Sequence, residues 1–121
     1  MKKLIVLIIG ILCQIYVFSQ NKSYAEILLN MAEKGNVQAQ SELGYKYYLG
    51  NGVPKDYKKA VHWYRKAAEQ GNNIAQNLLG VCYDNGHGVP RNYKQAFIWY
   101  GKSAEQGNYF ALLNLAMRSE E

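Results

Sequence analysis

Few side chains in this 121-residue sequence are of the types that activate water, hold a metal ion or attack a substrate. The sequence contains two His and two Cys. His62 and His87 have no cluster of Cys or carboxylate residues nearby, so we predict no metal site. No Ser-His-Asp or Cys-His set has a usable spacing, and the loop Gly50–Gly52 lacks the following Lys-Ser or Lys-Thr pair of a phosphate-binding loop. We therefore predict no catalytic, cofactor or metal residue, and a protein that is not an enzyme.

Size and charge restrict the function further. A chain of 121 residues suits one small domain. The formal charge is +5, but Lys2 and Lys3 lie in a segment that we expect to be removed. From Gln20 onward there are 12 basic and 9 acidic residues, and this mild excess does not indicate a nucleic-acid partner.

The first 19 residues have the pattern of a secretory signal peptide. Lys2 and Lys3 precede an apolar run, and the segment ends at the small residue Ser19, after which we place the cut. The short leader indicates a bacterial protein, exported to the periplasm or secreted, without stable membrane insertion after cleavage. An uncleaved anchor is an alternative, although the run of 15 residues from 4 to 18 is shorter than the roughly 20 that span a bilayer. Lipidation at Cys13 is disfavoured by the large Leu12 before it.

Removal of the leader would leave Cys82 as the single cysteine. An exported protein with one thiol has no internal disulfide. Cys82 then has two interpretations, either a small, semi-buried apolar residue or the site of an intermolecular disulfide.

The strongest pattern in the chain is a repeat of 36 residues. When residues 39–74 are placed over 75–110, 20 of the 36 pairs are identical. The same offset reaches both ends, because residues 32–36 match 68–72 and residues 111–116 match 75–80 at several positions. We therefore divide the chain into a signal peptide at 1–19, a leading half-repeat helix at 20–38, repeat one at 39–74, repeat two at 75–110, and a trailing half-repeat cap at 111–121.

Each repeat reads as two helices separated by a glycine-containing turn. In the first helix Ala39, Leu43 and Tyr47 form one apolar edge. Gly44 beside that edge costs about 1 kcal/mol against Ala, so its recurrence as Gly80 indicates a closely packed neighbouring helix. The second helix has the spacing of a buried stripe, and its aromatic residues are predicted to be core rather than a cofactor site. The stripe comprises Ala60, Trp63, Tyr64, Ala67 and Ala68.

Polar and glycine residues mark the helix ends. Asp56 and Asn92 stand where a side-chain oxygen can cap the second helix of each repeat. Gly35, Gly71 and Gly107 stand at the expected C′ position. An Asn follows each of these glycines and is placed to start the next helix.

These motifs together resemble the Sel1-like repeat (SLR) family, relatives of the tetratricopeptide repeats. The resemblance rests on the Gly-x-Gly-Val loop, the Trp-Tyr pair and the Ala-Glu-Gln-Gly ending, each present twice. It implies an all-α, right-handed α-solenoid of stacked helical hairpins, with about six helices in this chain. It also implies a scaffold for protein interaction.

In a solenoid of this type the first helix of each hairpin lines the concave side. With Leu43 placed inward, a helical wheel turns the opposite positions of both repeats outward. Tyr45 and Tyr48 are the anchors we expect, since Tyr is enriched at interface hot spots, although they also fit ordinary exposed aromatics. A basic outer face on the second helix, which includes His62, is interpreted as solvated. The predicted partner-binding residues are Glu42, Tyr45, Tyr48, Leu78, Val81 and Asp84.

The sequence therefore predicts a non-catalytic, exported, monomeric scaffold that binds a protein or peptide. The alternative is a cell-wall or β-lactam-binding envelope protein with weak hydrolase activity, since some cysteine-rich relatives are described in that way. Those relatives carry a Cys pair in each repeat. Here Cys82 is opposite Lys46 in the alignment of the two repeats, which disfavours the alternative.

Overall fold

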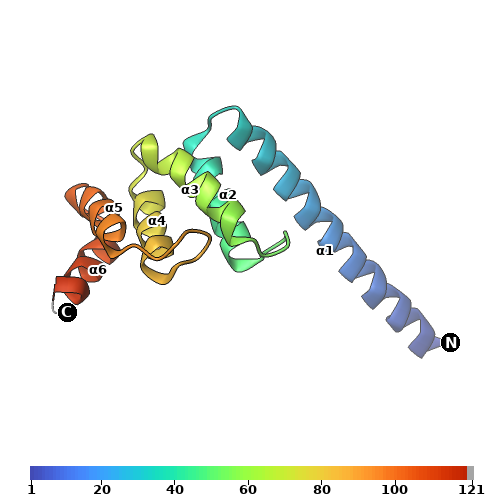
Figure 1. Ribbon diagram of the computed structural model, residues 1–121. Helices are drawn as coiled ribbons and strands as arrows, with labels where there is room; N and C mark the ends of the chain where they lie inside the picture. The colour runs from blue at the N-terminus through green and yellow to red at the C-terminus, as the bar shows by residue number, and fades with distance from the viewer. Residues whose placement is uncertain (120–121) are drawn as a thin grey trace.

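The computed structural model describes residues 1–119, which form six helices that follow one another along an α-solenoid (Figure 1). Each helix packs mainly on the one before it and the one after it. The predicted all-α solenoid of helical hairpins is confirmed. The helices are α1 (Lys2–Glu33), α2 (Val37–Leu49), α3 (Tyr57–Glu69), α4 (Asn73–Asn85), α5 (Tyr93–Glu105) and α6 (Tyr109–Ser119).

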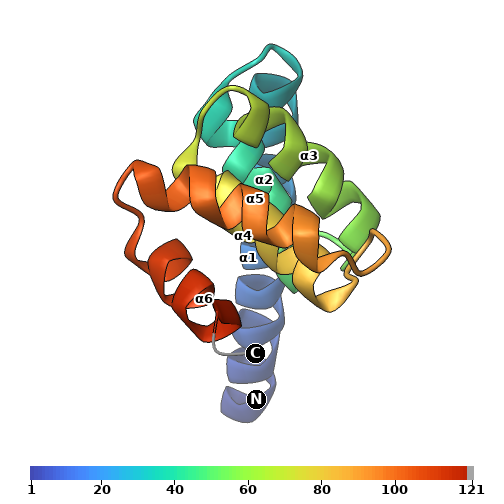
Figure 2. The same cartoon turned by 60° about the vertical axis from the view of Figure 1, so that its left-hand side comes forward.

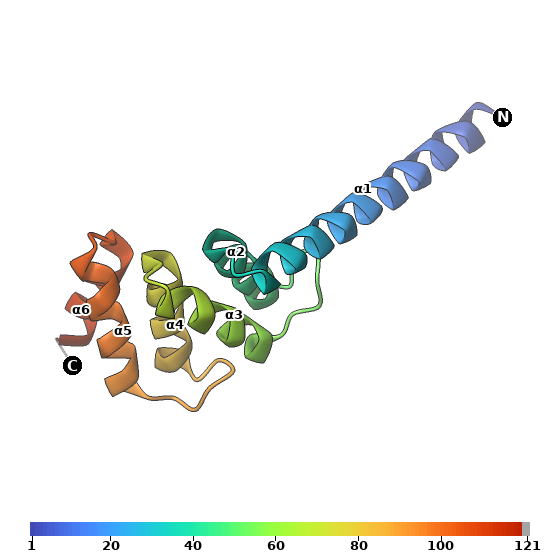
Figure 3. The ribbon, with the colours of Figure 1, turned by 90° about the horizontal axis from the view of Figure 1, so that it is seen from above.

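The leader and the leading half-repeat form one helix, α1, which projects from the end of the solenoid as an arm (Figure 3). Residues 1–20 are all exposed. The helix is continuous because this stretch has no Pro and a single Gly, Gly10. By length and composition α1 could cross a membrane, although a signal sequence passes the same test. The anchor and the signal peptide therefore both fit this helix.

Local side-chain chemistry fixes the helix ends, as the sequence predicts. Asn36 and Asn72 accept hydrogen bonds from the backbone N–H groups of Ala39 and Ala75, at 2.9 and 2.8 Å. Asn108 accepts from the backbone N–H of Ala111 in the same way. The glycine before each Asn has a positive φ between 90° and 95°, a conformation that favours glycine. The three connections between hairpins are therefore the same turn.

The core lies between successive helices and is built around the two repeated Tyr residues of α3 and α5. Tyr64 and Tyr100 are fully buried. Each ring lies against a glycine of the preceding helix, so that a Cβ added at Gly44 or Gly80 would be 2.6 Å from the ring. This contact explains the recurrent mid-helix glycine that the sequence shows. Trp63 belongs to a second cluster, where it joins residues of α1 and α2.

The last helix differs from the expected cap. Caps of solenoids carry a polar outer face, whereas α6 exposes several large apolar side chains and packs against α5 on its other side. Figure 2 shows α5 and α6 in front of the other helices, and Figure 1 shows them at the end of the solenoid opposite to the arm of α1. The exposed residues are Tyr109, Phe110, Leu112, Leu113 and Met117.

The glycine–tyrosine contact yields a first prediction, the effect of Gly80→Ala. Helix propensity alone would favour Ala by about 1 kcal/mol, but the new methyl group has no room against Tyr100, which is itself fully buried. Overpacking of a core costs about 1–3 kcal/mol, so we expect a net loss of unfolding free energy and a fall of several degrees in Tm.

The matched control is Gly101→Ala, in the middle of α5, where an added Cβ meets no atom within 4 Å. We expect this variant to be more stable than the wild type by up to about 1 kcal/mol. Urea unfolding followed by circular dichroism measures both changes. Equal stabilisation by the two substitutions would show that the close contact does not restrict the packing.

Candidate partner-binding face

Two of the six predicted binding residues, Glu42 and Tyr45, are exposed on α2. Tyr45 has 49% of its surface exposed. Glu42 accepts a hydrogen bond of 2.5 Å from the Tyr24 hydroxyl of α1, and the Lys46 ammonium lies 5.0 Å from the centre of the same ring. The hydrogen bond to Glu42 raises the pKa of Tyr24. Glu42 is therefore exposed but already held by the neighbouring helix.

Tyr48 does not point outward, and the expectation from the helical wheel is wrong for this residue. Its ring is half-buried, 5.1 Å from the ring of Tyr57, and its hydroxyl is 2.8 Å from Nδ1 of His87. His87 in turn stacks on Tyr57 at 4.3 Å. Burial raises the pKa of Tyr48. The physical reason is that the loop of repeat two folds over the start of α3 and covers the side of α2 that the wheel leaves free.

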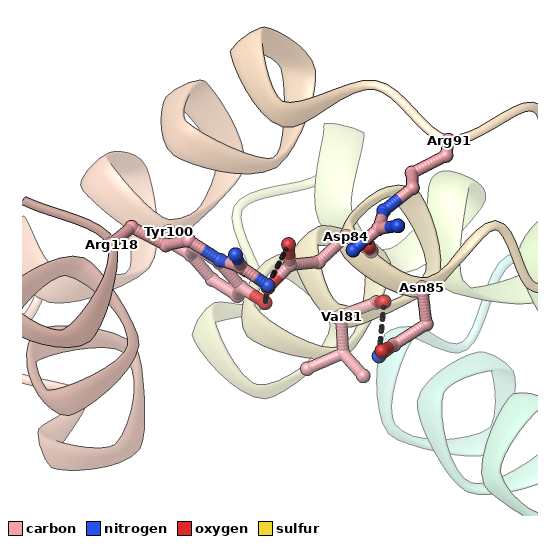
Figure 4. Close-up of polar contacts among 6 residues, drawn as sticks. All are labelled: Val81, Asp84, Asn85, Arg91, Tyr100 and Arg118. Atoms are coloured by element: carbon pink, nitrogen blue, oxygen red, sulfur yellow. Dashed lines mark hydrogen bonds and ion pairs between the residues drawn. The ribbon is translucent and has the colours of Figure 1, made fainter. Parts of the chain in front are cut away.

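Asp84 is likewise buried rather than outward-facing, with 7% of its surface exposed. Figure 4 shows its carboxylate facing Tyr100 of α5 and Arg118 of α6, which approach it from the same side. Tyr100 donates a hydrogen bond of 3.0 Å to Oδ2, Arg118 Nε donates another of 2.9 Å, and the Arg118 guanidinium forms an ion pair with Oδ1. Burial and the adjacent carboxylate both raise the pKa of Tyr100. Asp84 therefore fastens α6 to the solenoid.

The last two predicted residues, Leu78 and Val81, are half-buried, and Leu78 packs against the core. Val81 occupies the position that Tyr45 has in the first repeat. A further step of 36 residues leads to Met117 on α6, which is exposed. We call these three residues, together with the exposed Leu49 and Phe110, the first-helix face. Sequence reasoning missed the α6 residues because it treated this helix as a cap, although the 36-residue offset pointed to them.

A cavity of about 660 Å³ lies where α1 passes the loop of repeat one. Its wall includes Leu29 of α1, Tyr47 of α2, and Val53 and Pro54 of the loop. Phe18 of the predicted leader also lines it. The corresponding place in repeat two is filled, because Val89 packs on the core and His87 stacks on α3.

The two histidines and Cys82 have structural surroundings. His62 is exposed beside Trp63, and His87 belongs to the aromatic contact with Tyr48. Cys82 is fully buried and unpaired, and burial raises its pKa to about 12. Within residues 1–119 there is no group of three or more His, Cys, Asp or Glu that could hold a metal ion. The interpretation of Cys82 as a buried apolar residue agrees with this structure.

Stacked helical hairpins with a row of equivalent side chains define the class of helical-repeat scaffold proteins. The Sel1 repeat model matches residues 37–72 and 73–108, two residues earlier than our division and with the same length. The chain therefore belongs to the Sel1 repeat family. Proteins of this family are generally protein-interaction scaffolds and typically non-catalytic.

Three relatives illustrate the likeness. The Secretory immunoglobulin A-binding protein EsiB of Escherichia coli O6:H1 is 48% identical over 42 residues, which are 35% of this chain and 9% of EsiB. The crystal structure of c5321, a protective antigen of uropathogenic E. coli with an SLR fold, has a TM-score of 0.73 and 43% identity over 74% of this chain and 19% of that one. Helicobacter pylori cysteine rich protein B has a TM-score of 0.68 and 30% identity over 73% and 66% of the two chains.

The buried thiol yields a second prediction. In the native protein lacking residues 1–19, Cys82 will react with a thiol reagent at pH 8 far more slowly than in urea, because the thiol is inaccessible and its raised pKa leaves little thiolate. Absorbance of the released thiol product, with and without denaturant, measures the ratio. Fast native labelling, or a disulfide-linked dimer in non-reducing electrophoresis, would support the intermolecular disulfide instead.

Proposed function

We propose that this protein is a non-catalytic scaffold that binds a protein or peptide through the first-helix face. The observation that carries the proposal is the exposure of apolar side chains at one equivalent position of successive first helices, Tyr45 on α2 and Met117 on α6, with the half-buried Val81 between them. Aromatic and methionine side chains are enriched in the buried centres of interfaces. Glu42 and Asn85 add exposed polar groups near this row.

The relatives support a protein as the class of partner. EsiB is named for binding an immunoglobulin, and the c5321 structure is described as that of an antigen. The present chain matches only 9% of EsiB and 19% of c5321. The partner therefore need not be shared.

We also propose that the protein is exported and cut after Ser19. Counted back by 36 residues, the first residue of α3, Tyr57, corresponds to Asn21. Cleavage after Ser19 would thus trim α1 to the length of the second helix of a repeat. Every residue from 1 to 20 is exposed, so the cut would remove no side chain from the core.

No observation favours the β-lactam alternative. The Cys pair on which that comparison depends is absent from each repeat, and Cys82 is fully buried. The fold shared with H. pylori cysteine rich protein B does not transfer an activity, because function resides in the site and not in the fold.

The binding proposal predicts that Tyr45→Ala/Leu49→Ala abolishes capture of a partner. Both side chains are about half exposed, so their truncation should leave the stability unchanged while removing apolar contact area. Residues 20–121 and the variant are immobilised in parallel, incubated with cell-envelope and secreted fractions, and compared by quantitative mass spectrometry.

The matched control is His62→Ala/Lys66→Ala on the outer face of α3, where both residues are exposed. A partner lost from the first variant and retained by this control supports the first-helix face. Loss from the control alone would move the site to the basic outer face and contradict the proposal.

The export proposal predicts the N-terminus of the mature protein. When the full chain is expressed in a bacterium, intact-mass measurement of the periplasmic and secreted fractions should give a species beginning at Gln20. A full-length species that sediments with membranes and is released only by detergent would establish the uncleaved anchor.

A further inference from the structure

The two ends of the solenoid correspond to two halves of one repeat. In the repeat register α1 stands 36 residues before α3, so it is a second helix that precedes the first complete hairpin. In the same register α6 follows α4 by 36 residues, so it is a first helix. The two lie at opposite ends of the solenoid (Figure 1). One molecule therefore presents a second helix at one end and a first helix at the other.

In the complete hairpins the second helix covers one side of the first helix. The equivalent side of α6 is apolar. On α2 and α4 that side includes Gly44 and Gly80, which contact the ring of the following helix. On α6 it comprises Tyr109, Leu112 and Ala116, all exposed. The position of Leu112 is occupied by the buried Gln40 and Gln76 in the two repeats. Within residues 1–119 no helix covers this side of α6.

The exposed side of α1 has the matching pattern. Ile27 stands at the position of Trp63, and Met31 at that of the fully buried Ala67; both α1 side chains are exposed. Three polar residues near the C-terminal end of α1 fall on the outer positions that His62, Lys66 and Glu69 occupy on α3. These three are Glu26, Asn30 and Glu33. This part of α1 thus has the amphipathic pattern of the second helix of a hairpin. It differs only in that the side bearing Ile27 and Met31 is exposed.

The closest pair of positions in the complete hairpins is occupied by different residues at the two ends of the chain. In the complete hairpins a glycine of the first helix faces a tyrosine of the second, as Gly44 faces Tyr64. At the two ends the register aligns Ala116 of one molecule with Leu28 of another. Leu28 is 4% exposed and packs with Ala39 and Leu43 of its own molecule, so the exposed Ile27 and Met31 beside it are the side chains left to meet α6.

Two side chains of α5 and α6 are less buried than their equivalents in repeat one, and the side chain of Ile27 from another molecule fits over them. In repeat one, Trp63 clusters with Ala32 and Leu43, which are 1% and 0% exposed. Their equivalents at the far end, Ala104 and Leu115, remain half-buried. The residue that would cover them is the one at the Trp63 position of the next second helix, and on α1 this residue is Ile27.

We propose that α6 of one molecule receives α1 of a second molecule, so that the chain associates head to tail and continues the solenoid. The contact is heterologous, since it joins two different surfaces, and such contacts are open-ended unless the rotation closes a ring. The association replaces the monomer expected from the sequence. It does not use Tyr45 or Leu49, the two residues substituted in the partner-capture experiment, so the two proposals are tested separately.

The test uses residues 20–121, because residues 1–19 contribute no buried side chain. Sedimentation equilibrium from micromolar to near-millimolar concentration should show a weight-average mass that rises above the monomer. Ile27→Arg and Leu112→Arg, at side chains that are 54% and 56% exposed, should each give a monomer with unchanged Tm. Ile98→Arg is the matched control, because Ile98 is an exposed apolar residue at the outer His62 position, and it should associate like the wild type.

The decisive measurement is a mixture of the two monomeric variants. Ile27→Arg retains a wild-type α6 side, and Leu112→Arg retains a wild-type α1 side, so an equimolar mixture should form a one-to-one dimer and nothing larger. A wild-type chain that stays monomeric at all concentrations overturns the proposal. So does an Ile27→Arg variant that still associates alone, since that result would show α6 pairing with α6.

Discussion

The contact between a glycine of one helix and a tyrosine ring of the next determines how each hairpin packs. At Gly44 and at Gly80 a single methyl group would enter the ring of Tyr64 or Tyr100. Because protein interiors are close-packed, this approach fixes the distance and rotation of the two helices. The second helix then packs its Trp on its own first helix and on the helix before that, as Trp63 does on α2 and α1. The spacing of side chains along the first-helix face follows from the same contact.

Most of the fold could be predicted from the sequence because its determinants are local. The offset of 36 residues, the Asn caps and the glycines of positive φ act within a few residues of each other. The continuous α1 was not predicted, since the sequence around the proposed cut after Ser19 contains no helix-breaking residue. An enzyme recognises the end of a leader, and that recognition does not require residues of low helix propensity.

The candidate site was predicted less well because burial there depends on residues far along the chain. Tyr48 is covered by His87, 39 residues later, and Asp84 is covered by Arg118, 34 residues later. A helical wheel shows only the positions within one helix, so it cannot show either contact. The same pair of positions shows how the two repeats diverged: Tyr100 donates to Asp84, whereas Tyr64 faces Tyr48 and its hydroxyl has no hydrogen-bond partner in the described part of the chain.

The order of the helices has a consequence for the kinetics of folding. Since each helix packs on its neighbours in the sequence, the contact order is low, and helical proteins of low contact order fold in microseconds to milliseconds. Neither Cys13 nor Cys82 is in a disulfide, so no slow oxidation step is required. Each hairpin can therefore form as soon as its second helix has been synthesised, without contacts from later parts of the chain.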